Sequence, residues 1–110
     1  MVMFGSIAVM KPKTGKEEAF VALMDEWWRL RTPEPVPGAV AMHVYRGIED
    51  PSIFMAPVIF HSREEYEANA NDPAQSAWHR KLGSLLTEPP EWIDGDIVSS
   101  HRAPGESDPT

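Results

Sequence analysis

The side chains best suited to chemistry lie together in residues 53–86, where Tyr66, Trp78 and His79 occur close to one another. An imidazole has an ordinary pKa of about 6.5, so His79 can exchange a proton near neutral pH. A phenol donates or accepts hydrogen bonds, and an indole offers a large apolar surface to an aromatic ligand. This stretch therefore predicts a pocket.

A strand is predicted over residues 53–60, directly before these side chains. The run is apolar, rich in Ile, Val and Phe, and it follows a turn-forming segment at residues 50–52. Apolar residues without polar alternation indicate a strand that is buried on both faces, as in the centre of a sheet. Pro57 has no N–H group for a sheet hydrogen bond, so we expect a local bulge or break there.

A helix that is interrupted near its middle is predicted to follow this strand. Ser62 and Glu65 form a capping box, which indicates the helix start. Asp72, Pro73 and Gln75 supply a second start, with a cap, a first-turn proline and a reciprocal partner. We therefore expect a break near residue 71. The second part carries one apolar face and two residues beside it: Ala74, Trp78, Leu82 and Leu85, flanked by His79 and Leu86.

The N-terminal part of the chain predicts one strand and one helix. Residues 2–10 are a strand candidate with apolar side chains on both faces. Thr14 and Glu17 form a capping box, and the helix is expected to continue to about Leu30. Its inner face carries an apolar stripe at helical spacing: Phe20, Leu23, Met24 and Trp27.

Two further strands complete the pattern. A proline-rich connection at residues 32–38 precedes a strand at residues 39–46, which we expect to form a hairpin with the strand at residues 53–60. The last strand is predicted at residues 92–101, with an interruption at the sequence Asp-Gly-Asp of residues 94–96. The final residues, 103–110, are predicted to be a disordered tail behind a single domain at residues 1–102.

The order strand, helix, strand, strand, helix, strand predicts an α+β, ferredoxin-like βαββαβ fold. Its four-stranded antiparallel sheet would carry two helices on one face. The other face would be exposed and apolar in a monomer, which soluble monomers rarely tolerate. Pairing of this face with an identical sheet resolves the problem, so a homodimer is predicted.

Composition limits the functional classes. The net charge of −7 argues against binding to nucleic acid or to an anionic membrane, since both need clustered Lys and Arg. The chain has no cysteine, and its 4 histidines are dispersed, so no metal site is expected. Neither a signal peptide nor a run of about 20 apolar residues is evident, which predicts a cytoplasmic protein without a membrane segment.

Two passages, VIFHSREEYEANANDPAQSAWHRKL and PGAVAMHVYRGIEDPSIF, together with the element order, resemble the antibiotic biosynthesis monooxygenase family. The resemblance spans residues 4–100 and implies a dimeric α/β barrel. It also implies oxidation of an anthrone or phenol without metal or flavin, through deprotonation of the substrate and direct reaction with dioxygen. Tyr66 matches a helix tyrosine of the family, and the basic residue falls at His79 or Arg80. The family's strand Asn and Trp are replaced by Ala56 and Phe60.

The leading hypothesis is a cofactor-independent monooxygenase-like enzyme that oxidises a small aromatic or polyketide-type phenol. His79 would be the general base, and Tyr66 and Arg80 would stabilise the anion. The predicted substrate-binding walls are Trp78, Phe60 and Trp27. His43 and Tyr45 share one face of their strand and would either line the pocket or contact the dimer partner.

Three alternatives stay open. A non-enzymatic dimer that binds a small ligand is favoured by the loss of polar groups at Ala56 and Phe60. A haem-binding or haem-degrading protein would use His79 as the axial ligand, but the family's tryptophan is absent from residues 67–70. A cyclase or isomerase would use the same base and pocket without oxygen.

Overall fold

The computed structural model describes residues 3–29 and 38–105. It confirms the predicted element order, with the second strand and the second helix each divided in two. The elements are β1 (Phe4–Met10), α1 (Glu17–Arg29), β2 (Ala39–Met42), β3 (Tyr45–Arg46), β4 (Phe54–Phe60), α2 (Arg63–Ala70), α3 (Pro73–Leu85) and β5 (Glu91–Asp96).

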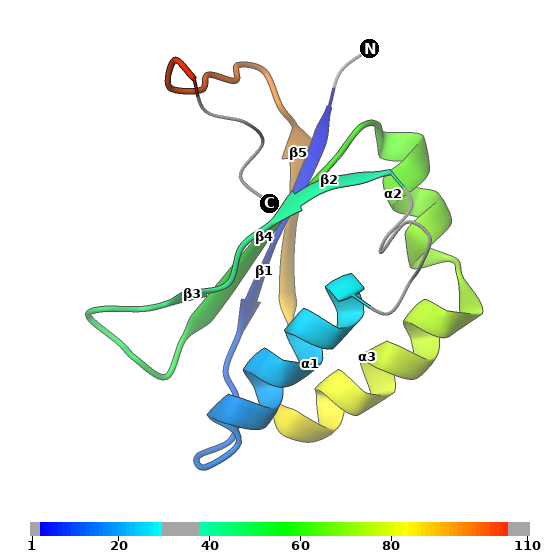
Figure 1. Cartoon of the computed structure of the whole chain (residues 1–110). Coiled ribbons are helices and arrows are strands. Elements are labelled where there is room, and N and C mark those ends of the chain that lie inside the picture. The colour runs from blue at the N-terminus through cyan, green and yellow to red at the C-terminus, as the bar shows by residue number, and fades with distance from the viewer. Residues whose placement is uncertain (1–2, 30–37, 106–110) are drawn as a thin grey trace.

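The strands form one antiparallel sheet in the order β2-β4-β1-β5, and β3 extends beside β4. The pairing of β2 and β3 with β4 confirms the predicted hairpin. In Figure 1 the helices lie on one side of the sheet, with α1 beside α3. The α+β, ferredoxin-like βαββαβ fold is therefore the observed one.

Alternation along the two long strands divides the sheet into two faces. Even-numbered residues of β1 and β4 are buried beneath the helices, and odd-numbered residues point to the opposite face. On that outer face Ile7 is 41% exposed, although it lies in a central strand, and Ile93 beside it on β5 is 53% exposed. Both faces of β1 are thus apolar, as the sequence predicts.

The helix-facing side of the sheet is packed by a continuous apolar core. Phe20 of α1 meets Phe54 of β4 edge to face, with ring centroids 5.1 Å apart. Leu82 brings α3 into the same cluster. The remaining members of the cluster come from β1, α1, β4 and the residue that follows α3: Ala8, Met10, Leu23, Met24, Ala56 and Leu86.

The strand predicted at residues 39–46 is divided between β2 and β3, and Pro57 supplies the reason. The carbonyl of Pro57 accepts a hydrogen bond from the N–H of His43 at 3.0 Å, but proline has no N–H to return. The predicted bulge in β4 itself is wrong, because Pro57 pairs in regular register with Ile7. The register shift lies instead in β2, between Ala39 and Ala41.

The predicted start of α1 at Thr14 is also wrong. Gly15 has a positive φ of 84°, and the N–H of Lys16 donates to the carbonyl of Lys13, which closes a turn over these residues. The helix therefore begins only at Glu17. Leu30 and most of the proline-rich connection lie outside the described residues.

The break in the second helix is confirmed. The Ser62 side chain accepts the N–H of Glu65 at 3.2 Å, and the Asp72 side chain accepts the N–H of Ala74 at 2.9 Å. The sequence predicts that Gln75 completes the second capping box. This prediction is wrong, because the side-chain amide of Gln75 bonds Trp27 and His79 instead. Ala74, placed on the apolar face by spacing, is exposed.

The last strand is shorter than predicted. Residues 94–96 belong to β5 rather than interrupt it, because Ser6, Gly5 and Phe4 of β1 pair with them in register. Residues 97–105 form no strand. Residues 106–110 lie outside the described residues, so the disordered tail stays a prediction. Within the described residues, no helix is long and apolar enough to cross a membrane.

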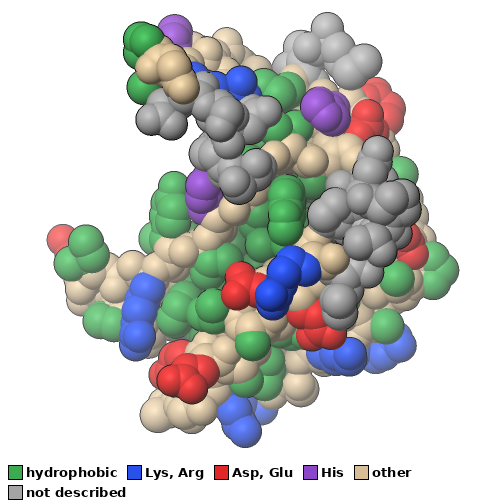
Figure 2. Space-filling model, in the orientation of Figure 1, with side chains coloured by type: hydrophobic (Ala, Val, Ile, Leu, Met, Phe, Trp, Pro, Cys, Tyr) green, Lys and Arg blue, Asp and Glu red, His purple; other side chains and the backbone are tan. Residues whose placement is uncertain are grey.

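A shallow groove runs between α1 and β3. Charged side chains of α1, among them Glu17 and Asp25, line one side, and Val44 and Phe54 line the other. Figure 2 shows hydrophobic side chains in the middle of this view, with acidic and basic side chains below them and to the right. The described lining of this groove includes neither histidine, tyrosine nor tryptophan, in contrast to the pocket described next.

Candidate active site

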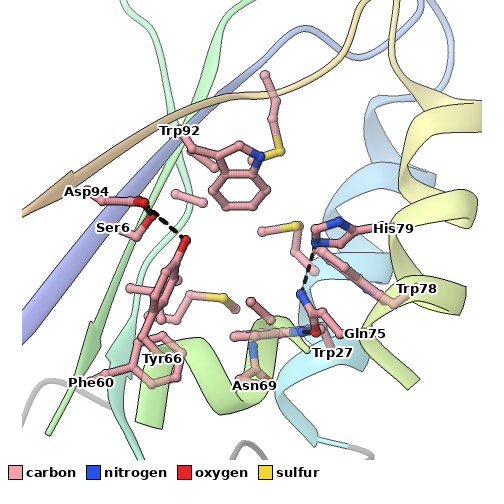
Figure 3. A pocket seen from close by; sticks show the side chains of 17 residues that line it. Ser6, Trp27, Phe60, Tyr66, Asn69, Gln75, Trp78, His79, Trp92 and Asp94 are labelled. Atoms are coloured by element: carbon pink, nitrogen blue, oxygen red, sulfur yellow. Dashed lines mark hydrogen bonds between the residues drawn. The ribbon is translucent and has the colours of Figure 1, made fainter. Parts of the chain in front are cut away.

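A cavity of about 220 Å³ lies between the helix-facing side of the sheet and the helices. Its walls are largely aromatic, and Figure 3 shows their side chains arranged around a central space. The aromatic residues come from five different elements: Trp27, Phe60, Tyr66, Trp78 and Trp92. Polar groups occur on two opposite sides of this space (Figure 3). One set lies on α1 and α3, and the other lies on the sheet and α2.

The polar group on the helix side is a chain of two hydrogen bonds. The indole Nε1–H of Trp27 on α1 donates to Oε1 of Gln75 on α3 at 2.7 Å. Nε2 of Gln75 lies 3.0 Å from Nε2 of His79, one turn further along α3. Gln75 is only 6% exposed and Trp27 only 7%, so both ends of the first bond are shielded from water.

This chain fixes the protonation of His79. An indole nitrogen only donates, so Gln75 must accept through Oε1 and donate through Nε2. The acceptor of that second bond, His79 Nε2, must then carry no proton, and a neutral imidazole in this form is protonated at Nδ1. Burial also lowers the pKa of His79 from its ordinary value. His79 is therefore held neutral at physiological pH.

Tryptophan rings fix the position of the imidazole. The His79 ring stacks on Trp92 of β5 at 5.7 Å with an interplanar angle of 14°, and its other neighbour is Trp78 at 5.3 Å. Trp78 is held in turn by its Nε1–H, which donates to the Leu23 carbonyl of α1 at 3.3 Å. These contacts join α1, α3 and β5 around one titratable group.

The polar group on the sheet side is a carboxylate held by two hydroxyls. Ser6 of β1 donates to Asp94 Oδ1 at 2.5 Å, and the Tyr66 hydroxyl of α2 donates to the same carboxylate at 3.3 and 3.4 Å. The pairing of Ser6 with Asp94 in the β1–β5 ladder brings them together. Tyr66 reaches them from across the pocket wall because its ring packs edge to face on Phe60, with centroids 5.4 Å apart.

Burial raises the pKa of Tyr66, and the nearby negative charge of Asp94 raises it further. The hydroxyl of Tyr66 therefore remains protonated over the physiological range and acts as a hydrogen-bond donor. Its bonds to Asp94 are long, so a ligand group can replace them at little cost.

Five of the predicted site residues line this pocket. They are His79, Tyr66, Trp78, Phe60 and Trp27. The structure thus brings together the aromatic walls and the titratable side chain that the sequence predicts, while their roles in catalysis stay predictions.

Three predicted site residues lie elsewhere. Arg80 is exposed on α3 and does not line the pocket, because a residue directly after His79 on a helix is rotated to another side. His43 and Tyr45 are odd-numbered residues beside Pro57 and Met55 of β4, so they face away from the helices. Their prediction as pocket residues is corrected; contact with a dimer partner remains open for both.

Five polar or aromatic pocket residues were missed by the sequence analysis as site residues: Gln75, Asp94, Ser6, Trp92 and Asn69. Gln75 was interpreted as a cap, and Asp94 as the interruption of a strand. Ser6 alternates with Phe4 and Ala8 on the buried side of β1, and a lone hydroxyl in an apolar alternation was the available signal. Asn69, interpreted as a residue at the helix break, is buried and also lines the pocket.

In the described part of the chain, no group of three or more His, Cys, Asp or Glu side chains is arranged to hold a metal ion. The pocket itself carries one imidazole and one carboxylate. The chemistry that these groups offer is proton transfer and hydrogen bonding to a small aromatic ligand.

Replacement of Gln75 by Glu should raise the pKa of His79 above its ordinary value of about 6.5, whereas in the wild type it lies below that value. The carboxylate of Gln75→Glu still accepts the Trp27 N–H, but it favours the protonated imidazole that the amide disfavours. NMR titration of the imidazole ring protons measures the pKa of His79 in the wild type and in the variant. The exposed His101 serves as the reference in the same spectra, and an unchanged His79 pKa would contradict the hydrogen-bond chain.

Known proteins with a similar sequence or structure share this architecture. The family model for antibiotic biosynthesis monooxygenase matches residues 3–81. No curated protein sequence matches the chain. Among solved structures, a candidate antibiotic biosynthesis monooxygenase from Chloroflexus aurantiacus J-10-fl is 21% identical with a TM-score of 0.72, over 91% of this chain and 97% of that one.

Two further structures are similar. Rv0793 from Mycobacterium tuberculosis is 17% identical with a TM-score of 0.76, over 91% of this chain and 99% of its own. The NE2512 protein of unknown function from Nitrosomonas europaea is 19% identical with a TM-score of 0.74, over 96% and 98% of the two chains. At such identities the structures show the shared fold. The match of the family model over most of the chain shows that this protein belongs to the antibiotic biosynthesis monooxygenase family.

Proposed function

We propose that this protein is a cofactor-independent monooxygenase that oxidises a small aromatic phenol with dioxygen. The observation that carries the proposal is the position of His79, whose Nε2 lies 3.0 Å from the Gln75 amide nitrogen in a pocket with aromatic walls. A base of this kind, placed among aromatic rings, can remove the hydroxyl proton of a phenol. The phenolate then supplies all the electrons to dioxygen: one oxygen atom enters the ring and the other leaves as water, so that phenol and dioxygen give a quinone and water.

The hydrogen bond between Gln75 and His79 sets the order of events. Nε2 of His79 accepts a substrate proton only when the Gln75 N–H has released it. A substrate oxygen that enters between the two side chains can take over the Gln75 donor while it gives its own proton to His79. The resulting oxyanion then lies beside an amide donor and a protonated imidazole, which is the stabilisation that the reaction needs. In this scheme Gln75, rather than the predicted Arg80, is the side chain that stabilises the anion together with His79.

The cavity volume limits the substrate. A cavity of about 150 Å³ holds benzene in a protein interior. The cavity here, at about 220 Å³, matches one ring with substituents or two small rings. A phenol of one or two rings is therefore a better match than a tricyclic anthrone within the predicted substrate class.

Haem fits this pocket poorly. The cavity of about 220 Å³ is far smaller than a porphyrin with its four pyrrole rings needs. His79 Nε2, the nitrogen that would ligate iron, already accepts a hydrogen bond from Gln75. The haem alternative is therefore the weaker one.

Oxygen uptake with purified protein tests the proposal. We expect consumption with substituted one-ring or two-ring phenols, and the same rate after dialysis against a chelator, because proton transfer by His79 requires no metal. An oxygen electrode measures both rates, with heat-inactivated protein as the control. Loss of uptake in chelator would contradict the cofactor-independent mechanism. Binding of phenols without uptake would favour the alternative of a ligand-binding dimer.

The proposed assembly is a homodimer that pairs the outer faces of two sheets. Ile7, Val9, Met55 and Ile59 form an apolar surface on the central strands, and Ile93 continues it onto β5. Such a surface in the centre of a sheet is stabilised by a second apolar layer. An identical sheet supplies that layer by two-fold symmetry. The pocket lies on the opposite side of the sheet, so each subunit would keep its own.

A further inference from the structure

The carboxylate of Asp94 has no part in the proton transfer proposed above, although it lines the same pocket. It lies on the side of the cavity opposite His79 and Gln75 (Figure 3). Among the described residues that line this pocket, Asp94 is the sole side chain with a formal charge at neutral pH, since His79 is held neutral. Its presence in a largely aromatic cavity therefore calls for a role.

The surroundings of Asp94 hold the carboxylate in place without neutralising it. Both groups that donate to it, Ser6 and Tyr66, are neutral hydroxyls. Ser6 is 3% exposed and binds Oδ1 tightly at 2.5 Å, which fixes the orientation of the carboxylate. A carboxylate has about four acceptor sites on its two oxygens, so the two hydroxyls leave acceptor capacity for a ligand.

We propose that Asp94, held by Ser6 and Tyr66, is a specificity-determining residue that selects aromatic ligands with a hydrogen-bond donor and rejects aromatic anions. The donor is a hydroxyl or a protonated amine, and the rings of Trp92 and Phe60 contact the rest of the ligand. A negatively charged ligand meets a carboxylate whose hydrogen-bond partners, Ser6 and Tyr66, are both neutral, so the like charges repel each other. This inference names the ligand class of the proposed active site and rests on that function only for its use in turnover.

The oxyanion of the proposed reaction is consistent with this selection. It forms on the opposite side of the pocket, next to the imidazole that has just accepted its proton, and so it has a counter-ion from the start. A ligand that carries a carboxylate is already charged when it enters the pocket, and no counter-ion is present among the described residues that line it. The distinction lies between a charge made inside the site and a charge brought into it.

Four one-ring probes of nearly equal size test the selection: 4-methylphenol, benzylammonium, benzoate and toluene. Binding is measured by NMR through the indole N–H signals under nitrogen, so that no oxidation interferes. Three of the 4 tryptophans, Trp27, Trp78 and Trp92, line the pocket, and Trp28 serves as the internal reference. We expect the wild type to bind 4-methylphenol and benzylammonium at least about tenfold more tightly than benzoate, from the typical strength of a hydrogen bond to a charged group.

Replacement of Asp94 by Asn keeps the size of the side chain and its contacts with the two hydroxyls, but removes the charge. We expect Asp94→Asn to lose about tenfold in benzylammonium affinity and to gain in benzoate affinity, with toluene unchanged. The matched control is Asp96→Asn, which makes the same change of net charge two residues along β5, outside this pocket. Ser6→Ala is a second variant, which should weaken the preference by freeing the carboxylate.

Several results would overturn the inference. These are equal binding of benzoate and 4-methylphenol by the wild type, the same order of affinities in Asp94→Asn as in the wild type, or no binding of either donor probe at millimolar concentration. Selective loss of benzylammonium alone would assign the site to amines, and parallel loss of 4-methylphenol would include hydroxyls. Donor-selective binding without oxygen uptake would leave this inference intact and contradict the oxygenase proposal.

Discussion

His79→Ala should lower the rate of oxygen uptake with a small phenol by about 10²–10⁴-fold, because removal of a general base typically has an effect of this size. Folding should be little affected. The imidazole lies at the rim of the pocket, and the core cluster of Phe20, Leu82 and their neighbours does not include it. An oxygen electrode measures the rate, and thermal melts show whether the variant is folded.

The matched control is Arg80→Ala, on the same turn of α3 but outside the lining of the pocket. It should retain the wild-type rate. Tyr66→Phe should show a milder loss than His79→Ala, since it removes one hydroxyl that donates to Asp94 and can donate to a ligand. Unchanged uptake in His79→Ala, in a folded protein, would remove the assignment of the base.

The pH dependence of the oxygen-uptake rate is a second test of the role of His79. The mechanism needs the neutral imidazole, so the rate should fall as the pH drops through the pKa of His79, which burial lowers. In Gln75→Glu this fall should begin at a higher pH, because the introduced carboxylate favours the protonated form. A shift in the opposite direction would contradict the role of Gln75.

Ile7→Lys should abolish the dimer. Ile7 lies in β1, between β4 and β5, and its side chain points to the outer face of the sheet. A charge in the middle of an apolar interface loses its hydration without gaining a partner, and it would occur in both subunits at symmetry-related positions. Light scattering after size exclusion should give twice the chain mass of 12.3 kDa for the wild type. The variant should be monomeric or insoluble.

Ile48→Lys is the control for this experiment. It makes the same substitution at a residue that is 95% exposed in the turn before β4. It should remain dimeric. A folded wild-type protein with the mass of one chain would contradict the proposed assembly. The same surface also makes Val9 a better position for a charge than Val44, which packs against the core beneath the helices.

Local signals in the sequence determined much of the fold. Caps at Ser62 and Asp72 acted as predicted because such hydrogen bonds join residues two or three positions apart. Strand geometry separates odd from even positions in β1 and β4, but both sets are apolar, so only the structure shows that the even-numbered side chains lie beneath the helices. Thr14 shows the limit: a turn around Gly15 competed with its capping box and displaced the helix start to Glu17.

The site was determined only in part by the sequence, because its polar groups meet through tertiary contacts. Tyr66, Trp78 and His79 lie close together in the chain and could be predicted as a group. The contact of Gln75 with Trp27 spans 48 positions, and that of Ser6 with Asp94 spans 88. No periodicity connects residues at such separations. Sheet pairing and helix packing decided these contacts, and they hold His79 neutral and leave a carboxylate in the pocket.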